Sequence, residues 1–159
     1  MKANNIPLFL FGLAALVISC TETNEPSEFE YSLMFSGETS KTWNLKSIAF
    51  RNEGDPEWKL DDPCWSDDRY IFYRDAERKF EFKTGSNKCD PSEDPFTLTD
   101  TWSFTNANAT LYFIFPLLAD FALPYTVKEI DKNDMVLEIY FNDAGSQSYR
   151  MKFESDDEN

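Results

Sequence analysis

The 159-residue sequence contains no histidine. Histidine is the usual general base of enzymes, the commonest metal ligand and the partner of serine and cysteine nucleophiles, so most such sites are excluded. Glycine is also scarce, with 5 residues, and neither a Gly-x-Ser-x-Gly motif nor a glycine-rich phosphate loop occurs. We therefore expect neither an enzyme nor a cofactor.

Basic residues are few compared with acidic ones. The chain has 15 Lys and Arg against 29 Asp and Glu, which gives a formal net charge of -14. A surface of this sign repels phosphate backbones, so nucleic acid is excluded as a partner. The acidic excess also means that neighbouring carboxylates are common by chance, which weakens any argument built on a single pair.

Aromatic residues, in contrast, are abundant. They make up 16% of the chain, with 15 Phe, 7 Tyr and 4 Trp, and hydrophobic residues reach 42%. This composition is typical of a globular domain, and the aromatic bias favours β-strands with one heavily aromatic face.

The N-terminus carries the clearest motif. Residues 6–18 form an apolar run of 13 residues, about 20 Å as a helix and so short of the ~30 Å hydrocarbon core, which indicates a signal peptide. The run ends in Val-Ile-Ser-Cys, which resembles the lipobox of bacterial lipoproteins. The resemblance implies cleavage after Ser19 and diacylglyceryl transfer to the Cys20 thiol. An ordinary signal peptide with an incidental cysteine is the alternative.

The resemblance to a lipobox implies a protein of the cell envelope, bound to a membrane through N-terminal acyl chains, on its periplasmic face or at the cell surface. Position 21 is Thr rather than the Asp that favours inner-membrane retention, so we expect the outer membrane. Residues 1–19 are then the leader, and residues 20–35 the lipidated cysteine and a flexible acidic tether. Removing the leader takes away only Lys2 among the charged residues, so the mature charge is -15.

Cys64 and Cys89 remain as an even pair in an exported chain. An oxidising compartment makes a disulfide between them the default interpretation, with two free buried thiols as the alternative. The bridge would close a loop of about 25 residues, which corresponds to roughly 3.5 kcal/mol of chain entropy. With two thiols and no histidine, no zinc site is expected.

Short strand-like segments follow one another along the mature chain, joined mostly by turns. No long helix is indicated, and the spacing of the segments predicts an all-β, up-and-down antiparallel barrel of about eight strands. The apolar positions of the first segment change phase between Leu45 and Ile48, which suggests a bulge. The predicted strands span residues 43–51, 69–73, 79–83, 101–105, 110–115, 125–130, 135–141 and 148–153.

Four elements together resemble the lipocalin-like domains found in lipoproteins of Bacteroidetes. They are residues 40–45 (SKTWNL), 63–72 (PCWSDDRYIF), 85–89 (GSNKC) and 101–104 (TWSF). The resemblance implies an eight-stranded lipocalin-like barrel over residues 36–154 and a Cys64–Cys89 bridge. The acidic residues at 155–159 are expected to form a tail. Classical lipocalins carry Gly-x-Trp on the first strand, whereas Gly37 lies six residues before Trp43, so no particular ligand is carried over.

The barrel interior has two interpretations that the sequence leaves open. Its aromatic residues could line a cavity for an apolar ligand, or they could fill the core at close packing. The residues concerned are Trp43, Phe72, Phe80, Phe82, Trp102, Phe104, Phe113 and Phe115.

Acidic residues near the cysteines permit two further hypotheses. Oxygen ligands from loops could bind calcium, although no loop matches the EF-hand spacing and solvated acidic loops explain the same pattern. Asp67 and Asp68 could instead form a cap or turn that precedes the strand at Arg69. A glycosidase needs two carboxylates across a sugar cleft, for which a mature chain of 140 residues leaves little room. The calcium candidates are Asp61, Asp62, Asp67, Asp68, Asp90, Glu93 and Asp94.

Two functions fit these observations. The first is a membrane-anchored barrel that binds a small apolar or amphipathic molecule in its mouth. The second is a protein-interaction or accessory subunit of an envelope complex, with a packed barrel and apolar loop contacts at Trp58, Trp65 and residues 116–124. A ligand-sized cavity favours the first function, and a filled barrel with an exposed apolar loop favours the second.

Overall fold

The structure, a computed structural model, describes residues 28–60, 63–92, 94–105, 107, 109–141 and 147–156. The leader, Cys20 and the first part of the tether lie outside the described residues. The same is true of Asp61, Asp62 and Glu93 from the calcium candidates, and of the tail after residue 156.

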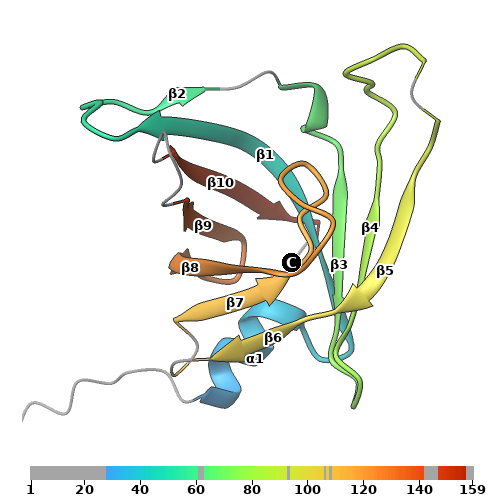
Figure 1. Cartoon of the computed structure of the whole chain (residues 1–159). Coiled ribbons are helices and arrows are strands. Elements are labelled where there is room, and N and C mark those ends of the chain that lie inside the picture. Colours follow the sequence, from blue (N-terminus) through green and yellow to red (C-terminus); the bar gives the residue numbers. More distant parts are fainter. Residues whose placement is uncertain are drawn as a thin grey trace, which may run out of the picture.

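Strands dominate the described chain (Figure 1). The elements in chain order are α1 (Glu28–Ser36), β1 (Ser40–Asn52), β2 (Lys59–Leu60), the 3-10 turn η1 (Pro63–Trp65), β3 (Arg69–Tyr73), β4 (Lys79–Lys83), β5 (Thr97–Thr101), β6 (Ser103–Thr105), β7 (Thr110–Phe113), β8 (Leu123–Ile130), β9 (Asp134–Tyr140) and β10 (Gln147–Ser155).

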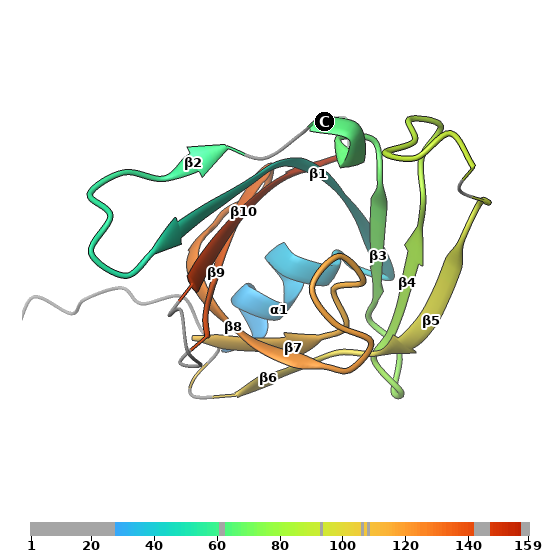
Figure 2. The ribbon, with the colours of Figure 1, turned by 45° about the horizontal axis from the view of Figure 1, so that its top comes forward.

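The strands form one antiparallel sheet that curls into a nearly closed barrel (Figure 2). Its order is β5-β4-β3-β1-β10-β9-β8-β7-β6, with the short β2 added to β1. The two ends of this order, β5 and β6, are separated in the chain only by Trp102, so one bent strand pairs with β4 and then with β7. Counted this way, and without β2, the described residues form eight strands in up-and-down order, which confirms the predicted fold class.

β1 is the longest strand and changes face at a bulge. Its pairing with β10 shifts register between Leu45 and Ser47, so that Leu45 pairs with Phe153 and Ile48 with Met151. Leu45 and Ile48 are both buried although they are three residues apart. The extra residue therefore explains the change of phase from which the bulge was predicted.

α1 corrects the expectation that a flexible tether extends to residue 35. Residues 28–36 are helical, and the Phe35 side chain is completely buried. Its ring lies 4.4 Å from the Phe72 ring, 4.9 Å from Trp102 and 5.0 Å from Phe104. The helix thus closes one end of the barrel, and the folded domain includes residues that composition assigned to the tether.

Hydrogen bonds fasten the C-terminal end of α1 to β1. The indole N–H of Trp43 donates to the Phe35 carbonyl at 2.8 Å, and the buried Lys41 ammonium donates to the Met34 carbonyl at 2.7 Å. Gly37 follows the helix with φ +64 and donates its N–H to the Leu33 carbonyl at 2.8 Å. A left-handed glycine at this position is a common helix stop.

Aromatic rings fill the barrel interior. Phe72 and Phe80 lie 4.9 Å apart, and each is 5.4 Å from Phe113. Tyr70 lies 5.0 Å from Phe82 and 5.3 Å from Phe115. These distances are typical of packed aromatic pairs, so the part of the interior that these rings occupy is a packed core and not an open cavity. Of the eight residues expected inside, seven are buried and Phe104 is half-buried.

Candidate binding pocket at the barrel mouth

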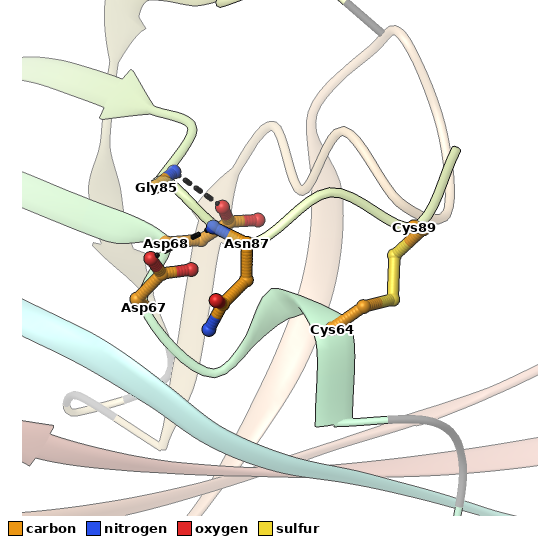
Figure 3. Close-up of a disulfide and its surroundings, with 6 residues drawn as sticks. All are labelled: Cys64, Asp67, Asp68, Gly85, Asn87 and Cys89. Atoms are coloured by element: carbon orange, nitrogen blue, oxygen red, sulfur yellow. Dashed lines mark hydrogen bonds between the residues drawn. A yellow bond between two sulfur atoms is a disulfide. The ribbon is translucent and has the colours of Figure 1, made fainter. Parts of the chain in front are cut away.

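The end of the barrel opposite α1 is its mouth (Figure 1). β3 starts there at Arg69, separated from the end of η1 by residues 66–68, and ends at Tyr73, which pairs with Ser40 beside α1. At the mouth Cys64 of η1 is bonded to Cys89 of the loop between β4 and β5, with Cα atoms 5.2 Å apart (Figure 3). The predicted disulfide is therefore confirmed, and it joins two of the longest irregular segments.

Asp67 organises the loop between β4 and β5. Its Oδ2 accepts hydrogen bonds from the Ser86 N–H at 2.7 Å and the Ser86 hydroxyl at 2.9 Å. It also accepts one from the Asn87 N–H at 3.1 Å (Figure 3). Burial opposes ionisation of this carboxyl group, but the hydrogen bonds outweigh it and hold its pKa below the usual range. A Cβ at Gly85 would overlap the Asp67 carboxyl group, so this close approach requires glycine.

Asp68 connects the same loop to the barrel wall. Its buried carboxylate accepts a hydrogen bond from the Gly85 N–H at 2.9 Å, and its carbonyl accepts one from the Leu45 N–H at 3.2 Å. The side chains of both aspartates thus accept hydrogen bonds from backbone N–H groups of the β4–β5 loop, 17 to 20 residues away in sequence, and so join two segments instead of capping the strand at Arg69. Among the described residues, no group of three or more His, Cys, Asp or Glu side chains is arranged to hold a metal ion.

A pocket of about 220 Å³ lies between these loops and the β7–β8 connection. Aromatic and aliphatic side chains form most of its wall, and the Phe82 and Phe96 rings lie 6.0 Å apart. Apolar walls with a few polar groups are typical of sites for small ligands. The lining residues are Trp65, Phe82, Pro95, Phe96, Pro116 and Leu117, with the polar Asp68, Thr84, Gly85, Asn87, Lys88 and Asp94.

The apolar loop residues that the sequence predicted as protein contacts do not form one surface. Trp65 and Leu117 line the pocket, whereas Phe121 is 61% exposed. Trp58 does not line this pocket: its ring lies against Arg51 at 4.6 Å and Arg150 at 4.3 Å, on strands β1 and β10. Trp58 is therefore already covered by two guanidinium groups.

Sequence reasoning identified only part of this pocket. Of the eight aromatic residues proposed to line a ligand cavity, Phe82 alone lines it. Phe96 was missed because it lies in a segment without alternation, just before β5, a polar strand that was also missed. The signals that pointed toward this region were the two cysteines and the apolar stretch at residues 116–124.

No protein-family model matches the chain, and no curated protein matches it. Within the described ranges, no helix is long and apolar enough to cross a membrane.

Proposed function

We propose that the protein is a membrane-anchored, lipocalin-like binding protein that holds a small apolar or amphipathic molecule in the mouth pocket. The observation that carries this proposal is the pocket of about 220 Å³ walled by Trp65, Phe82, Phe96 and Leu117. Burial of apolar ligand surface against these side chains supplies affinity, at about 25 cal/mol per Å² before the costs of association. Asp68 and Lys88, also in the lining, supply polarity that orients the ligand.

The packed interior limits the ligand to a small molecule. Pockets for drug-sized ligands span about 300–1,000 Å³, which exceeds the volume of 220 Å³ at the mouth. Aromatic rings occupy the barrel below it. A medium-chain ketone or alcohol fits such a pocket, and a large polycyclic ligand does not.

Filling the pocket with protein should remove binding. In a Leu117→Trp variant the larger side chain takes ligand space, so we expect affinity for 2-octanone, measured by NMR titration, to fall by about tenfold or more. Leu117 is half-buried at the mouth, so the free energy of unfolding should change by less than about 1.5 kcal/mol. The matched control is Phe121→Trp, on the same connection but outside the pocket. Equal affinity of both variants and the parent protein would contradict the proposal.

The alternative function is protein interaction at the same end of the barrel. It is favoured by the exposed rings of Phe121, 61% exposed, and Phe96, 47% exposed. Exposed aromatic side chains often mark contact surfaces. In that role Phe121 would carry the contact, while Leu117 would be of minor importance.

The anchoring part of the proposal depends on Cys20. Replacement of Cys20 by alanine should move the protein from the membrane pellet to the supernatant, because each acyl methylene contributes about 0.8 kcal/mol to membrane binding. Cell fractionation and the mass of the N-terminal peptide measure this change, with Thr21→Ala as the control that stays in the pellet. An unacylated Cys20 in the parent protein would disprove the lipoprotein assignment.

The helix that follows the proposed anchor in sequence and the pocket lie at opposite ends of the barrel. α1 starts at Glu28, eight residues after Cys20, and closes the end opposite the mouth (Figure 1). Eight residues span at most about 28 Å. Acyl chains on Cys20 would therefore lie within about 28 Å of the start of α1.

A further inference from the structure

Two tyrosine hydroxyls inside the barrel have no hydrogen-bond partner among the described residues. They belong to Tyr70 and Tyr125, and both side chains are 0% exposed. Buried hydroxyl groups are nearly always paired, because an unpaired one loses its hydrogen bonds to water without replacement. Phenylalanine would fill the same space without this penalty, so the two hydroxyls need a reason other than packing.

The two tyrosines lie close together around the same pair of rings. Phe113 is 6.3 Å from the Tyr70 ring and 4.7 Å from the Tyr125 ring. Phe115 is 5.3 Å from the Tyr70 ring and 6.3 Å from the Tyr125 ring. Tyr70 and Tyr125 therefore form one polar site within an otherwise apolar core.

This polar site lies directly beneath the mouth pocket. Tyr70 pairs across the sheet with Phe82, a pocket residue, and their rings are 5.0 Å apart. Phe115, which stacks on Tyr70, immediately precedes the pocket residue Pro116. Phe82 both lines the pocket and contacts Tyr70, so displacement of this one ring would extend the pocket toward Tyr70, and such side-chain changes are common on binding.

The electrostatics of the site determine which ligand groups it accepts. Burial raises the pKa of Tyr70 well above its ordinary value, and the nearby Asp68 carboxylate and Tyr125 raise it further. Burial also raises the pKa of Tyr125. Both hydroxyls therefore remain protonated donors at neutral pH, while the negative charge of Asp68 disfavours a ligand carboxylate.

We propose that the ligand carries an uncharged oxygen, as in a ketone, aldehyde, ester or alcohol, which accepts hydrogen bonds from the hydroxyls of Tyr70 and Tyr125. The apolar part of the ligand remains between Trp65, Phe82 and Phe96 in the mouth. This inference rests on the proposed function, because it names the ligand class of the same pocket.

The test compares two ligands that differ in one group. NMR titrations of the exported, oxidised protein use 2-octanone and 2-methyl-1-octene, in which a methylene group replaces the carbonyl oxygen. We expect Tyr70→Phe and Tyr125→Phe each to weaken binding of the ketone by about tenfold, and to leave binding of the alkene unchanged within about twofold. Tyr112→Phe, at a half-buried tyrosine of β7 whose neighbours Leu111 and Phe113 point inward, is the matched control.

The stability of the variants provides a second readout. Since each substitution removes an unpaired buried hydroxyl, the melting temperature of Tyr70→Phe and Tyr125→Phe should stay equal or rise. A lower melting temperature, or an unchanged affinity for the ketone, would overturn the inference. An equal loss of affinity for the ketone and for the alkene would also overturn the inference, because such a result would indicate a packing effect. Failure of the parent protein to bind either probe would instead overturn the proposed function itself.

Discussion

Replacement of Phe35 by alanine is expected to lower the free energy of unfolding by about 3–5 kcal/mol, the usual range for a fully buried phenylalanine. Phe35 is 0% exposed and its ring contacts Phe72, Trp102 and Phe104. Removing it would leave a cavity at the closed end of the barrel, between α1 and the sheet. Urea unfolding followed by tryptophan fluorescence measures the change.

The control for this substitution is Phe121→Ala, which truncates a phenylalanine that is 61% exposed. Such a surface substitution should change stability by less than about 0.5 kcal/mol. If Phe35→Ala were equally mild, residues 28–36 would behave as the tether that composition suggested. The closed end of the barrel would then have to be formed without α1.

Loss of the Cys64–Cys89 disulfide should have the second largest effect on stability. The bond joins residues 25 apart in sequence, and closing such a loop stabilises the folded state by about 3.5 kcal/mol on the chain-entropy estimate. A Cys64→Ala, Cys89→Ala double variant should therefore unfold at a lower urea concentration than the oxidised parent. Because the bond connects η1 to the β4–β5 loop, the double variant should also bind 2-octanone more weakly.

The reducing agent dithiothreitol provides an independent control. It should destabilise the parent protein to about the level of the double variant and leave the double variant itself unchanged. Equal stability of the oxidised parent and the double variant would show that the bridge adds nothing to the fold. In that case the hydrogen bonds of Asp67 and Asp68 alone would hold the mouth loop in place.

The strands could be predicted where buried apolar residues alternate with more exposed polar residues along the chain. The hairpin of β3 and β4 has the expected limits, because Tyr70, Phe72, Phe80 and Phe82 all point inward at period two. The bulge in β1 could be located for the same reason. The disulfide followed from the even count of cysteines that remain after Cys20 and from the expectation that the chain is exported.

α1 and β5 could not be predicted because local sequence does not determine them. α1 depends on one buried ring and on hydrogen bonds from Trp43 and Lys41, which are tertiary contacts. β5 (Thr97–Thr101) is polar and largely exposed, and it pairs along its length with β4. The pocket was missed for the same reason, since its walls come from three separate connections whose arrangement depends on the disulfide and on Asp67.

The most direct test of the account is an NMR titration with 2-octanone that follows the indole N–H signals of the 4 tryptophans. Trp65 lines the pocket, and the Trp58 ring contacts Arg51 of β1 and Arg150 of β10. Trp43 and Trp102 donate their indole N–H groups to carbonyls of Phe35 and Tyr73 near the closed end. The account predicts a saturating shift of the Trp65 signal, while the other three stay in place. A shift of Trp43 or Trp102 without Trp65, or no shift at all, would contradict binding at the barrel mouth.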